Sequence, residues 1–531
     1  MRRSRILAWA ACAILAAGCS STVYVTRDVC IYGGTSAGVV AAVQASRMGR
    51  TVALVEPGKH LGGLTAGGLG ATDIGNKDAI GGISREFYRR LGKYYGKDEA
   101  WTFEPHVAEQ TFQAMLGETG VSIFTEERIV SVDRLGSTLT MVETKSTRES
   151  SGWLTRQRTI FRARVFIDAT YEGDLMAMTG VSYTVGREPN AKYNETLNGI
   201  RPETPYHQFQ VAVDPYVRPG DPGSGLLPLI QEGDGGPPGE GDQRIQAYNF
   251  RLCLTGDKEN QRPIEPPEDY FPARYELLAR YLEALSSSGK TPKLGEFLSI
   301  TEVPNGKTDI NNSGAFSTDY IGCNHAYPEA DPDERDRIQK EHEDYIRGFL
   351  HFLATSPRVP GSLQEEMRSW ALAKDEFVDT QGWPHQLYVR EARRMVSDHV
   401  MTEHSCRGTE KIDDPVGMGA YNMDSHNCQR IVKGGRVQNE GDVQARSVPY
   451  SISYRSIRPK VEDCTNLLVP VCLSASHIAY GSIRMEPVFM ILGQSAATAA
   501  CLAISSGRVI QAVDMGALRA RLLADKQVLE L

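Results

Sequence analysis

No Cys-x-x-Cys pair occurs in the sequence, although it contains ten cysteines among 531 residues. This absence excludes the common zinc-ribbon and iron–sulfur ligand patterns, and we expect no metal site. An excess of positive charge is also lacking, because the formal net charge is −8. The acidic balance argues against nucleic acid or an anionic membrane surface as the main partner, and we expect a small-molecule substrate instead.

The N-terminus lacks an apolar run long enough to span a bilayer, which takes about 20 residues. It has a basic start with Arg2, Arg3 and Arg5. An apolar run of roughly a dozen residues and then small residues follow, which is typical of a secretory signal peptide. The end of this segment resembles a bacterial lipoprotein lipobox and reads Leu15-Ala16-Ala17-Gly18-Cys19.

The lipobox resemblance implies a signal peptide over residues 1–19 and a lipidated Cys19. Acyl chains on one cysteine hold a protein to a membrane without a transmembrane helix. We therefore expect an exported, membrane-anchored bacterial lipoprotein on the periplasmic or outer-surface side, with Cys19 as its one membrane contact. Ordinary secretion is the alternative, and the Arg2-Arg3 pair also permits export by the twin-arginine route.

Residues 27–180 alternate strand-like and helix-like segments, which predicts a parallel sheet of the α/β class. Loop-rich segments and then helices fill residues 181–440, and one of these helices is expected over 362–377. Apolar and small-residue character returns in residues 441–525. The expected fold is thus a discontinuous Rossmann-like domain with an inserted, partly helical substrate domain.

The pattern of residues 28–57 predicts a strand, a glycine turn, a helix and a second strand. Gly33 and Gly38 hold the first and third places of the G-x-G-x-x-G fingerprint, where a tight turn and close helix–strand packing need glycine. Thr35 holds the second place, and Gly34 beside it keeps the turn open.

The helix that follows this turn begins with Ser36 and Ala37, so its N–H groups are expected to point at an anion. Thr and Ser side chains can add hydrogen bonds to a phosphate. Glu56 ends the second strand 18 residues after Gly38, close to the spacing of about 20 expected for an acid that binds ribose hydroxyls. The segment therefore predicts a dinucleotide site that disfavours NADP.

The segment after Glu56 distinguishes FAD from NAD. It contains two glycine pairs, Gly62-Gly63 followed by Leu64, and Gly67-Gly68. An NAD dehydrogenase has no need of such a run, whereas an extended FAD needs backbone close beside its ribityl chain and ring. We therefore predict FAD, with NAD as the rival.

The segments "YGGTSAG", "VALVEP" and "HLGGLTAGGLG" resemble the FAD-dependent oxidoreductases related to the FAD domain of heterodisulfide reductases and, more distantly, to succinate dehydrogenase and fumarate reductase flavoproteins. The resemblance covers most of the chain after residue 27. It is specific for FAD and unspecific for substrate. The iron–sulfur cysteine clusters of heterodisulfide reductases are missing, so their electron-bifurcating chemistry is not expected here.

"IDATYEGDL" resembles the second FAD motif of this family, which implies that Gly173 and Asp174 contact the cofactor. Asp168 in the same motif is a cofactor contact or a carboxylate that caps a turn. Val130, within the strand-like segment 119–136, is also assigned to the cofactor site. His60 lies where succinate dehydrogenases attach FAD covalently, although its spacing differs, and the alternative is a loop histidine.

Flavin chemistry needs an acid or base and balancing cations near the ring. His477 and Arg484 precede the last apolar helix and are the first candidates. The resemblance implies that backbone near Gly481 and Ser482 contacts the isoalloxazine. The alternative is a structural His477 and an internal salt bridge from Arg484 to Glu486.

A second candidate group lies in "MDSHNCQR", where Asp424 could orient His426 and Arg430 follows. The alternative is a polar loop. In "QLYVREARRM" a helix would place Arg390 and Arg394 on one face near Arg393. That face would be a solvated ion-pair surface or the anion-binding wall of a substrate site.

The sequence thus predicts an FAD-dependent oxidoreductase that acts outside the cytoplasm on a small polar substrate, with an unidentified electron acceptor. A hydroxyl-bearing, sugar-like molecule is the leading interpretation. One alternative is a flavin-dependent reductase of an unsaturated carboxylic acid. Another is a surface binding protein on a flavin fold, without catalysis.

Overall fold

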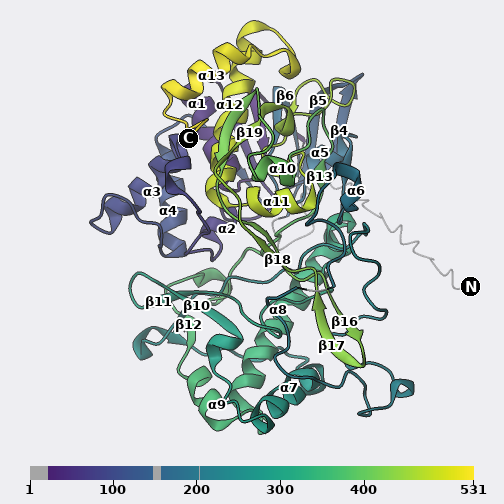
Figure 1. Ribbon diagram of the computed structural model, residues 1–531. Coiled ribbons are helices and arrows are strands. Elements are labelled where there is room, and N and C mark those ends of the chain that lie inside the picture. The colour runs from purple at the N-terminus through teal and green to yellow at the C-terminus, as the bar shows by residue number, and fades with distance from the viewer. Residues whose placement is uncertain (1–21, 148–156, 203) are drawn as a thin grey trace, which may run out of the picture.

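The computed structural model of the chain describes residues 22–147, 157–202 and 204–531. The predicted signal peptide, residues 1–19 with Cys19, lies outside the described residues. The described chain forms an upper body that contains both the N-terminal and the C-terminal segments and a lower body built from the middle of the sequence (Figure 1).

The upper body is built on a seven-stranded sheet. Its strands follow the order β3–β2–β1–β6–β5–β4, and β20 pairs with the second half of β6. Neighbours from β3 to β6 are parallel, whereas β5 and β4 add an antiparallel meander. The strands span β1 Thr22–Tyr32, β2 Val52–Glu56, β3 Ser122–Thr125, β4 Glu127–Leu135, β5 Thr138–Ser146, β6 Arg158–Asp168 and β20 Leu467–Leu468.

Two core helices of small residues pack on each other in this body. Helix α1 (Ser36–Arg47) follows β1, and α12 (Glu486–Ser506) comes from the far end of the chain. They approach closely because Gly493 has no side chain, since a Cβ there would lie 2.3 Å from the carbonyl oxygen of Ala37. Helix α12 is apolar and long enough to cross a membrane, but most of it is buried inside the protein.

The remaining helices of the upper body surround this core. They are α2 Gly63–Ala66, α3 Gly82–Tyr94, α4 Pro105–Gly117, α5 Asp174–Met178, α6 Asn190–Tyr193, α10 Glu403–Cys406, α11 His477–Ile483 and α13 Met515–Ala524. The eight cysteines of the described residues are all free, and each except Cys323 is buried.

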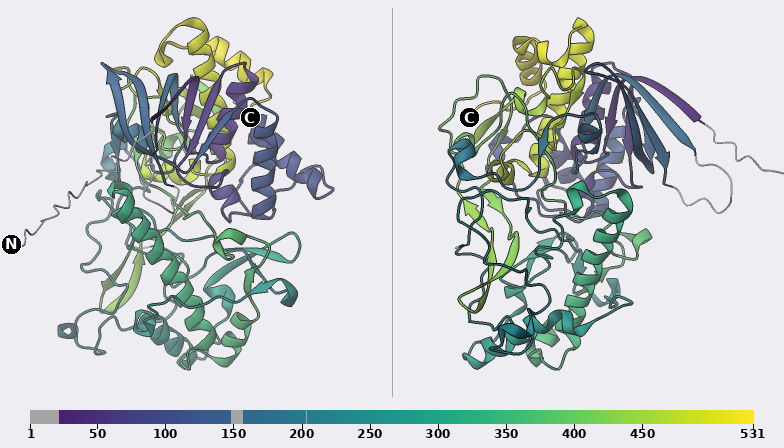
Figure 2. Two further views of the ribbon diagram at one scale, coloured as in Figure 1. Left: turned by 180° about the vertical axis from the view of Figure 1, so that it is seen from behind. Right: turned by 90° about the vertical axis from the view of Figure 1, so that its right-hand side faces the viewer.

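The lower body contains a five-stranded sheet of order β10–β11–β8–β12–β9, with three helices beside it (Figure 2). The strands are β8 Leu254–Thr255, β9 Gln261–Arg262, β10 Leu298–Val303, β11 Lys307–Asn312 and β12 Ala371–Ala373. The helices are α7 Glu276–Ser287, α8 Pro332–Thr355 and α9 Gly361–Arg368.

The helix predicted over 362–377 is wrong in its second half. Helix α9 ends at Arg368, and Ala371–Ala373 form β12 between β8 and β9. Ladder hydrogen bonds on both sides outweigh the helix propensity of this alanine- and leucine-containing stretch.

Short antiparallel ribbons complete the described chain (Figure 1). They pair β7 Tyr183–Thr184 with β13 Arg394–Met395, β14 Pro415–Gly419 with β19 Tyr450–Ser453, β15 Met423–Ser425 with β18 Val443–Ala445, and β16 Gln429–Lys433 with β17 Arg436–Glu440. The β15–β18 ribbon packs on α11, so it brings the edge of the lower body to the upper one.

A buried lysine fixes the two bodies against each other. Lys307 on β11 is 1% exposed, and its Nζ lies 2.7 Å from Glu104, 2.7 Å from Asp375 and 2.6 Å from Glu376. Glu104 belongs to the upper body and caps α4, where His106 also reaches Glu376 at 2.6 Å. The ammonium group compensates this carboxylate cluster and ties the bodies together at this point.

Candidate active site

The turn between β1 and α1 has the steric requirements of a nucleotide-binding loop. Gly33 has a φ of +101°, and a Cβ there would lie 2.7 Å from the amide nitrogen of Thr170. Gly38 is more tightly confined, because its Cβ would lie 1.9 Å from the carbonyl oxygen of Gly33. Only glycine fits either position.

Thr35, at the second place of the fingerprint, is the N-cap of α1. Its Oγ1 accepts a hydrogen bond from the Gly38 amide at 3.3 Å and donates one to the carbonyl oxygen of Ala169 at 2.7 Å. The Ser36 hydroxyl donates to Glu486 at 2.6 Å. Both hydroxyl groups are engaged by the chain itself, which leaves phosphate binding to the main-chain amides at this helix start.

Glu56 ends β2 beside the same turn. Its Oε2 accepts a hydrogen bond from the Gly34 amide, and its Oε1 accepts one from the Gly58 amide, each at 2.6 Å. Burial raises the pKa of this carboxyl to about 7, although the two amides act in the opposite direction. The carboxyl is therefore held rigidly where β2 meets the glycine turn.

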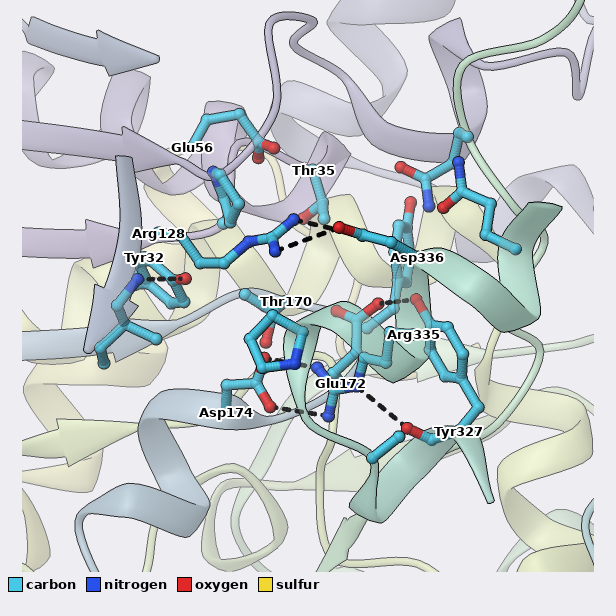
Figure 3. A pocket seen from close by; sticks show the side chains of 18 of the residues that line it. Tyr32, Thr35, Glu56, Arg128, Thr170, Glu172, Asp174, Tyr327, Arg335 and Asp336 are labelled. Atoms are coloured by element: carbon cyan, nitrogen blue, oxygen red, sulfur yellow. Dashed lines mark hydrogen bonds and ion pairs between the residues drawn. The ribbon is translucent and has the colours of Figure 1, made fainter. Parts of the chain in front are cut away.

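A cavity of about 510 Å³ opens at the carboxyl ends of β1 and β2. Gly33, Thr35, Glu56 and Val130 line it from the upper body (Figure 3). Helix α8 and the segment before it close it from the lower body. Ligands of open α/β sheets bind at this edge.

Ion pairs cross between the bodies at this cavity (Figure 3). Arg335 on α8 makes two contacts with Asp174, at 2.7 and 2.9 Å. Arg128 on β4 lies 3.4 Å from Asp336 on α8. The cavity is thus formed jointly by the two bodies, and its rim is charged.

Residues 28–522 match the family model described as FAD dependent oxidoreductase. The chain belongs to this family. The match confirms the predicted family, the α/β Rossmann-like fold, FAD as the cofactor and the assignment as an oxidoreductase. A search of the curated proteins found no match.

A comparison with solved structures gave matches of low identity and low TM-score. The Sdh1 complex of Mycobacterium smegmatis in the apo form is 12% identical, covers 31% of this chain and 42% of its own, and has a TM-score of 0.22. THI4 of Thermovibrio ammonificans is 18% identical over 31% of this chain and 66% of its own, with a TM-score of 0.24. A geranylgeranyl bacteriochlorophyll reductase-like protein of Thermoplasma acidophilum is 10% identical over 95% of this chain and 85% of its own, with a TM-score of 0.34.

The residues around the cavity fit the FAD of this family. The glycine turn leaves no space for side chains beside the α1 start, so backbone amides can approach a diphosphate. Glu56 is placed to bind ribose hydroxyls, as an acid at this point does in dinucleotide sites. Val130 also lines the cavity, and its assigned role toward FAD stays a prediction. FAD would therefore be held with its diphosphate at α1 and its adenosine half in this cavity.

The second glycine segment continues the backbone surface. Gly62 and Gly63 have φ values of +100° and +53°, and Thr35 forms a bridge to Gly62. The amide of Leu64 donates to the hydroxyl oxygen of Tyr171 at 2.8 Å. These three residues of the α2 start thus lie directly beside the α1 turn, as an extended cofactor requires.

Glu486, the first residue of α12, joins these segments. Its buried carboxylate accepts hydrogen bonds from Ser36 at 2.6 Å, Thr65 at 2.7 Å and Tyr171 at 2.7 Å. Burial raises its pKa, and the three hydroxyl groups oppose that shift. The salt bridge from Arg484 to Glu486, one alternative from the sequence, does not form. The Glu486 carboxylate instead accepts hydrogen bonds from these three hydroxyl groups.

Two aspartates of the second FAD motif have different surroundings. Asp168 holds the turn of the motif, and Asp174 contacts the lower body. Asp168 accepts from the Thr170 amide at 3.0 Å and from the Met176 amide at 2.8 Å, as a turn-capping carboxylate does. Gly173 has a φ of +71° and precedes α5. Asp174 lines the cavity and is ion-paired with the lower body. The assigned roles of Gly173 and Asp174 toward FAD stay predictions.

His60 lies outside the cavity wall. Its Nδ1 is 3.1 Å from Glu109 and its Nε2 is 3.0 Å from Asp379. The hydrogen bond to Glu109 raises the pKa of His60 and outweighs burial, which lowers it. Both ring nitrogens are therefore engaged, which favours the loop-histidine alternative over a covalent bond to FAD. The ring stacks at 3.9 Å on His385, which does line the cavity.

A second cluster of candidate residues lies at the β15–β18 ribbon. Asp424 pairs with Gln444 and Ser425 with Val443, and His426 and Asp442 adjoin the last of these pairs at the same end of the ribbon. Side chains alternate along a strand, which places Asp424 and His426 on one face and Ser425 on the other. Sequence reasoning paired Asp424 with His426, and the structure does bring the two together.

His426 lies between two carboxylates. Its Nδ1 is 2.7 Å from Asp319 Oδ2, and its Nε2 is 3.6 Å from Asp424 Oδ2. Asp319 was not identified from the sequence, because it lies 107 residues earlier in the chain. The one sequence signal was the block "SGAFSTD", which ends in this aspartate.

Three buried arginines surround Tyr388 near this cluster. Their guanidinium carbons lie 4.5 to 5.9 Å from the centre of the tyrosine ring, and Arg484 also donates to its hydroxyl oxygen at 2.8 Å. Each arginine also holds a carboxylate, in the pairs Arg484–Asp424 at 3.1 Å, Arg390–Asp319 at 2.9 Å and Arg251–Asp309 at 2.7 Å. Tyr388 and Arg251 were missed by sequence reasoning.

The helix predicted across the "QLYVREARRM" arginines is wrong. Residues 387–393 have no helix, and Arg394 begins β13. Arg390 and Arg394 are buried, so their face is no solvated surface. Arg393 instead pairs with Asp174 at 2.8 Å. Buried carboxylates from distant segments hold these arginines and outweigh the helical pattern.

His477, the first residue of α11, is buried behind the ribbon. Its Nε2 is 3.0 Å from Ser425 Oγ and its Nδ1 is 2.7 Å from Glu391 Oε2. Burial lowers its pKa to about 3, so the imidazole is neutral. These contacts favour the structural alternative, in which His477 supports the ribbon from the side opposite to His426.

Gly481 and Ser482 of the same helix also face the ribbon. A Cβ at Gly481 would lie 2.4 Å from the carbonyl oxygen of Asp424. Ser482 accepts from the Tyr450 hydroxyl at 2.8 Å and donates to the carbonyl oxygen of Tyr421. Arg430, by contrast, points into the lower body toward Asn439 at 2.9 Å. The predicted contact of Gly481 and Ser482 with the flavin ring stays a prediction.

Replacing His477 by alanine is expected to destabilise the protein and leave FAD bound. The change removes the hydrogen-bond partners of Ser425 and Glu391, and an unsatisfied buried group costs about 1–3 kcal/mol. Thermal unfolding of the holoenzyme should show a lower Tm. His351→Ala, at a partly exposed position, is the control and should leave Tm nearly unchanged. Equal Tm values for H477A and the wild type would contradict the structural role.

Proposed function

We propose that this FAD dependent oxidoreductase oxidises a small, hydroxyl-bearing polar substrate, with His426 as the base that accepts the hydroxyl proton. The contact that supports the proposal is the 2.7 Å hydrogen bond between His426 Nδ1 and Asp319. A carboxylate there keeps the proton of the neutral ring on Nδ1, so Nε2 carries the lone pair. This is the arrangement by which a histidine acts as a general base.

The exposure of the side chains supports the same assignment. His426 is 11% exposed and Asp424 is 17% exposed, whereas Arg390 and Arg484 are 0% and 2% exposed. A small molecule can therefore reach the imidazole and one carboxylate. The two arginines are buried, and their ion pairs hold Asp319 and Asp424 in place.

The protein and the cofactor divide the chemistry. FAD, when bound, supplies the two-electron oxidant. His426 accepts the proton at Nε2, and Asp319 stabilises the imidazolium that results. Asp424 would orient the substrate hydroxyl group beside Nε2. Arg484 compensates the charge of Asp424, which keeps that carboxylate ionised.

Reduction of an unsaturated carboxylic acid is the second candidate. It is considered because three arginines surround Tyr388. A substrate carboxylate would need an arginine with an unpaired charge. Each of the three arginines already holds an aspartate at 2.7 to 3.1 Å. This pairing is the reason that we prefer oxidation of a hydroxyl group.

We also propose that the protein acts outside the cytoplasm, anchored to a membrane through Cys19. The support is the sequence of residues 1–19 alone. Labelling of the expressed full chain with a radioactive fatty acid, with Cys19→Ala as the control, tests this. Label that remains in C19A would contradict it.

Anaerobic titration of the holoenzyme tests the reaction. Oxidised enzyme is mixed with a panel of sugars, polyols, amino acids and carboxylic acids, and the loss of the yellow flavin absorbance is recorded. Bleaching by a sugar or polyol is the expected result. If no hydroxyl compound bleaches the flavin and an unsaturated acid reoxidises the reduced enzyme, the second candidate is correct.

The reduction rate is expected to rise with pH on its acid side. Burial and Arg390 lower the pKa of His426, but Asp319 and Asp424 outweigh them, so the net shift is upward. A base works only when neutral, so its activity appears above this raised pKa. Asp319→Asn removes one raising charge and should move the acid limb to lower pH. The pH profile of single-turnover flavin reduction is measured for the wild type and for D319N. If the acid limbs of the two profiles coincide, the assignment of His426 as the base is contradicted.

A further inference from the structure

Asp442 immediately precedes β18 and His426 immediately follows β15, so the two residues lie at the same end of the β15–β18 ribbon, next to the last pair Ser425–Val443. It is 4% exposed, and its Oδ1 has no hydrogen-bond partner among the described residues. A buried carboxylate oxygen without a partner is unfavourable and marks a place where a donor is missing. The carboxylate therefore points to a ligand that brings its own hydrogen-bond donor.

His207 faces the same carboxylate. Its Nε2 lies 4.0 Å from Asp442 Oδ2, and its Nδ1 lies 3.3 Å from the carbonyl oxygen of Gly314. A carbonyl can only accept, so the proton of the neutral ring is on Nδ1, and Nε2 carries a lone pair. Burial lowers the pKa of His207, which keeps the ring neutral. The Gln444 side chain hydrogen-bonds to Asp442, but Oδ1 of that carboxylate has no partner among the described residues, and the lone pair of His207 Nε2 faces Oδ2.

The charges around His426 lead to the same conclusion. Asp319 and Asp424 each have an arginine partner, at 2.9 and 3.1 Å. Asp442 has no lysine or arginine partner among the described residues, and burial followed by Asp424 raises its pKa to about 7. Asp73 is also near Asp424. Burial first, and then the charge of Asp424, raise its pKa. Asp442 thus has no ion-pair neighbour among the described residues except the His207 ring at 4.0 Å.

We propose that the substrate carries a protonated amine close to the hydroxyl group that is oxidised, as amino sugars and amino polyols do. Asp442 and the Nε2 of His207 bind the ammonium group, while His426 Nε2 accepts the hydroxyl proton. The inference rests on the proposed oxidation of a hydroxyl compound and adds the charge of its substrate. An ammonium group supplies three donors and one positive charge, which satisfies both acceptors and compensates Asp442.

Matched substrate sets test the charge separately from the reaction. The holoenzyme is reduced anaerobically with glucose, glucosamine and glucuronate, and with neutral, amino and acid forms of other hexoses and linear polyols. The amino member of the productive set should have a KM at least about tenfold below that of the neutral member, since a charge-assisted hydrogen bond is worth about one order of magnitude or more.

Two variants assign this preference to residues. Asp442→Asn should raise the KM of the amino compound about tenfold and leave that of the neutral compound unchanged, because only the charge is removed. His207→Asn, which suits the φ of +54° at this position, should have a smaller effect in the same direction. Asp133→Asn, on the exposed part of β4, is the control and should change neither KM. FAD content and Tm of each variant establish that it is folded.

The outcomes separate the two proposals. If neutral compounds reduce the flavin as well as their amino counterparts, or if D442N and H207N keep the amine preference, the ammonium site is refuted and the oxidation of hydroxyl compounds stands. If no hydroxyl compound reduces the flavin, the proposed function itself is refuted.

Discussion

Gly38→Ala is expected to remove most of the FAD from the purified protein. The added Cβ would lie 1.9 Å from the carbonyl oxygen of Gly33 and 3.3 Å from the Ala169 side chain. The first of these neighbours is backbone of the turn that carries the diphosphate site, so the turn and α1 must separate. Overpacking of this kind costs about 1–3 kcal/mol. Because 1.4 kcal/mol corresponds to a factor of ten, the FAD affinity should fall about tenfold or more.

The ratio of flavin absorbance to protein absorbance measures this loss. Gly117→Ala is the matched control, since a Cβ at this exposed end of α4 meets nothing within 4 Å. Glu56→Ala tests the ribose side of the same site and should also reduce FAD content. The lower body has a sheet of its own, so circular dichroism should still show folded protein in each variant. Full FAD occupancy in G38A and E56A would refute the placement of the cofactor.

His426→Gln is expected to slow flavin reduction by about 10²–10⁴-fold, the usual contribution of a general base. Glutamine keeps the size and polarity of the side chain but cannot accept a proton at neutral pH. FAD content should change little, because the glycine turn and Glu56, which would hold the diphosphate and the adenosine half of FAD, are not altered. Stopped-flow reduction under anaerobic conditions, with the compound that bleaches the wild type, gives the rate.

Two comparisons make this result specific. His351→Gln changes a partly exposed histidine of α8 and should leave the rate unaffected. Asp319→Asn should slow the reaction less than H426Q does, since it removes the orienting carboxylate and keeps the base. If H426Q reduces FAD at the rate of the wild type, another group accepts the proton and His426 leaves the mechanism.

The nucleotide-binding turn could be predicted from the sequence because its determinants are local. Gly33, Thr35, Gly38 and Glu56 lie within 24 residues of each other, and each position has a steric or hydrogen-bonding requirement that few residue types meet. The helix α1 and the strands around it follow from the same short segment. The role of Thr35 as an N-cap is also typical of its residue type.

The proposed catalytic cluster around His426 could be predicted only in part. The spacing of Asp424 and His426 is local, and their pairing was anticipated. The ring orientation of His426 depends on Asp319, 107 residues away, and the charge of Asp424 depends on Arg484, 60 residues away. For His477 the sequence left two interpretations open, and the buried contacts with Ser425 and Glu391 favour the structural one.

The sequence by itself determined the cofactor, because the shape of a glycine turn depends on residues that follow one another in the chain. Only the tertiary structure decided which carboxylates and arginines are paired and which acceptors are left without a donor. The free energy of a buried charge depends on the partner that folding brings to it, and that partner comes from another segment. This is why FAD could be inferred from the residue pattern, whereas the substrate amine could be inferred only from Asp442 and His207 in the folded chain.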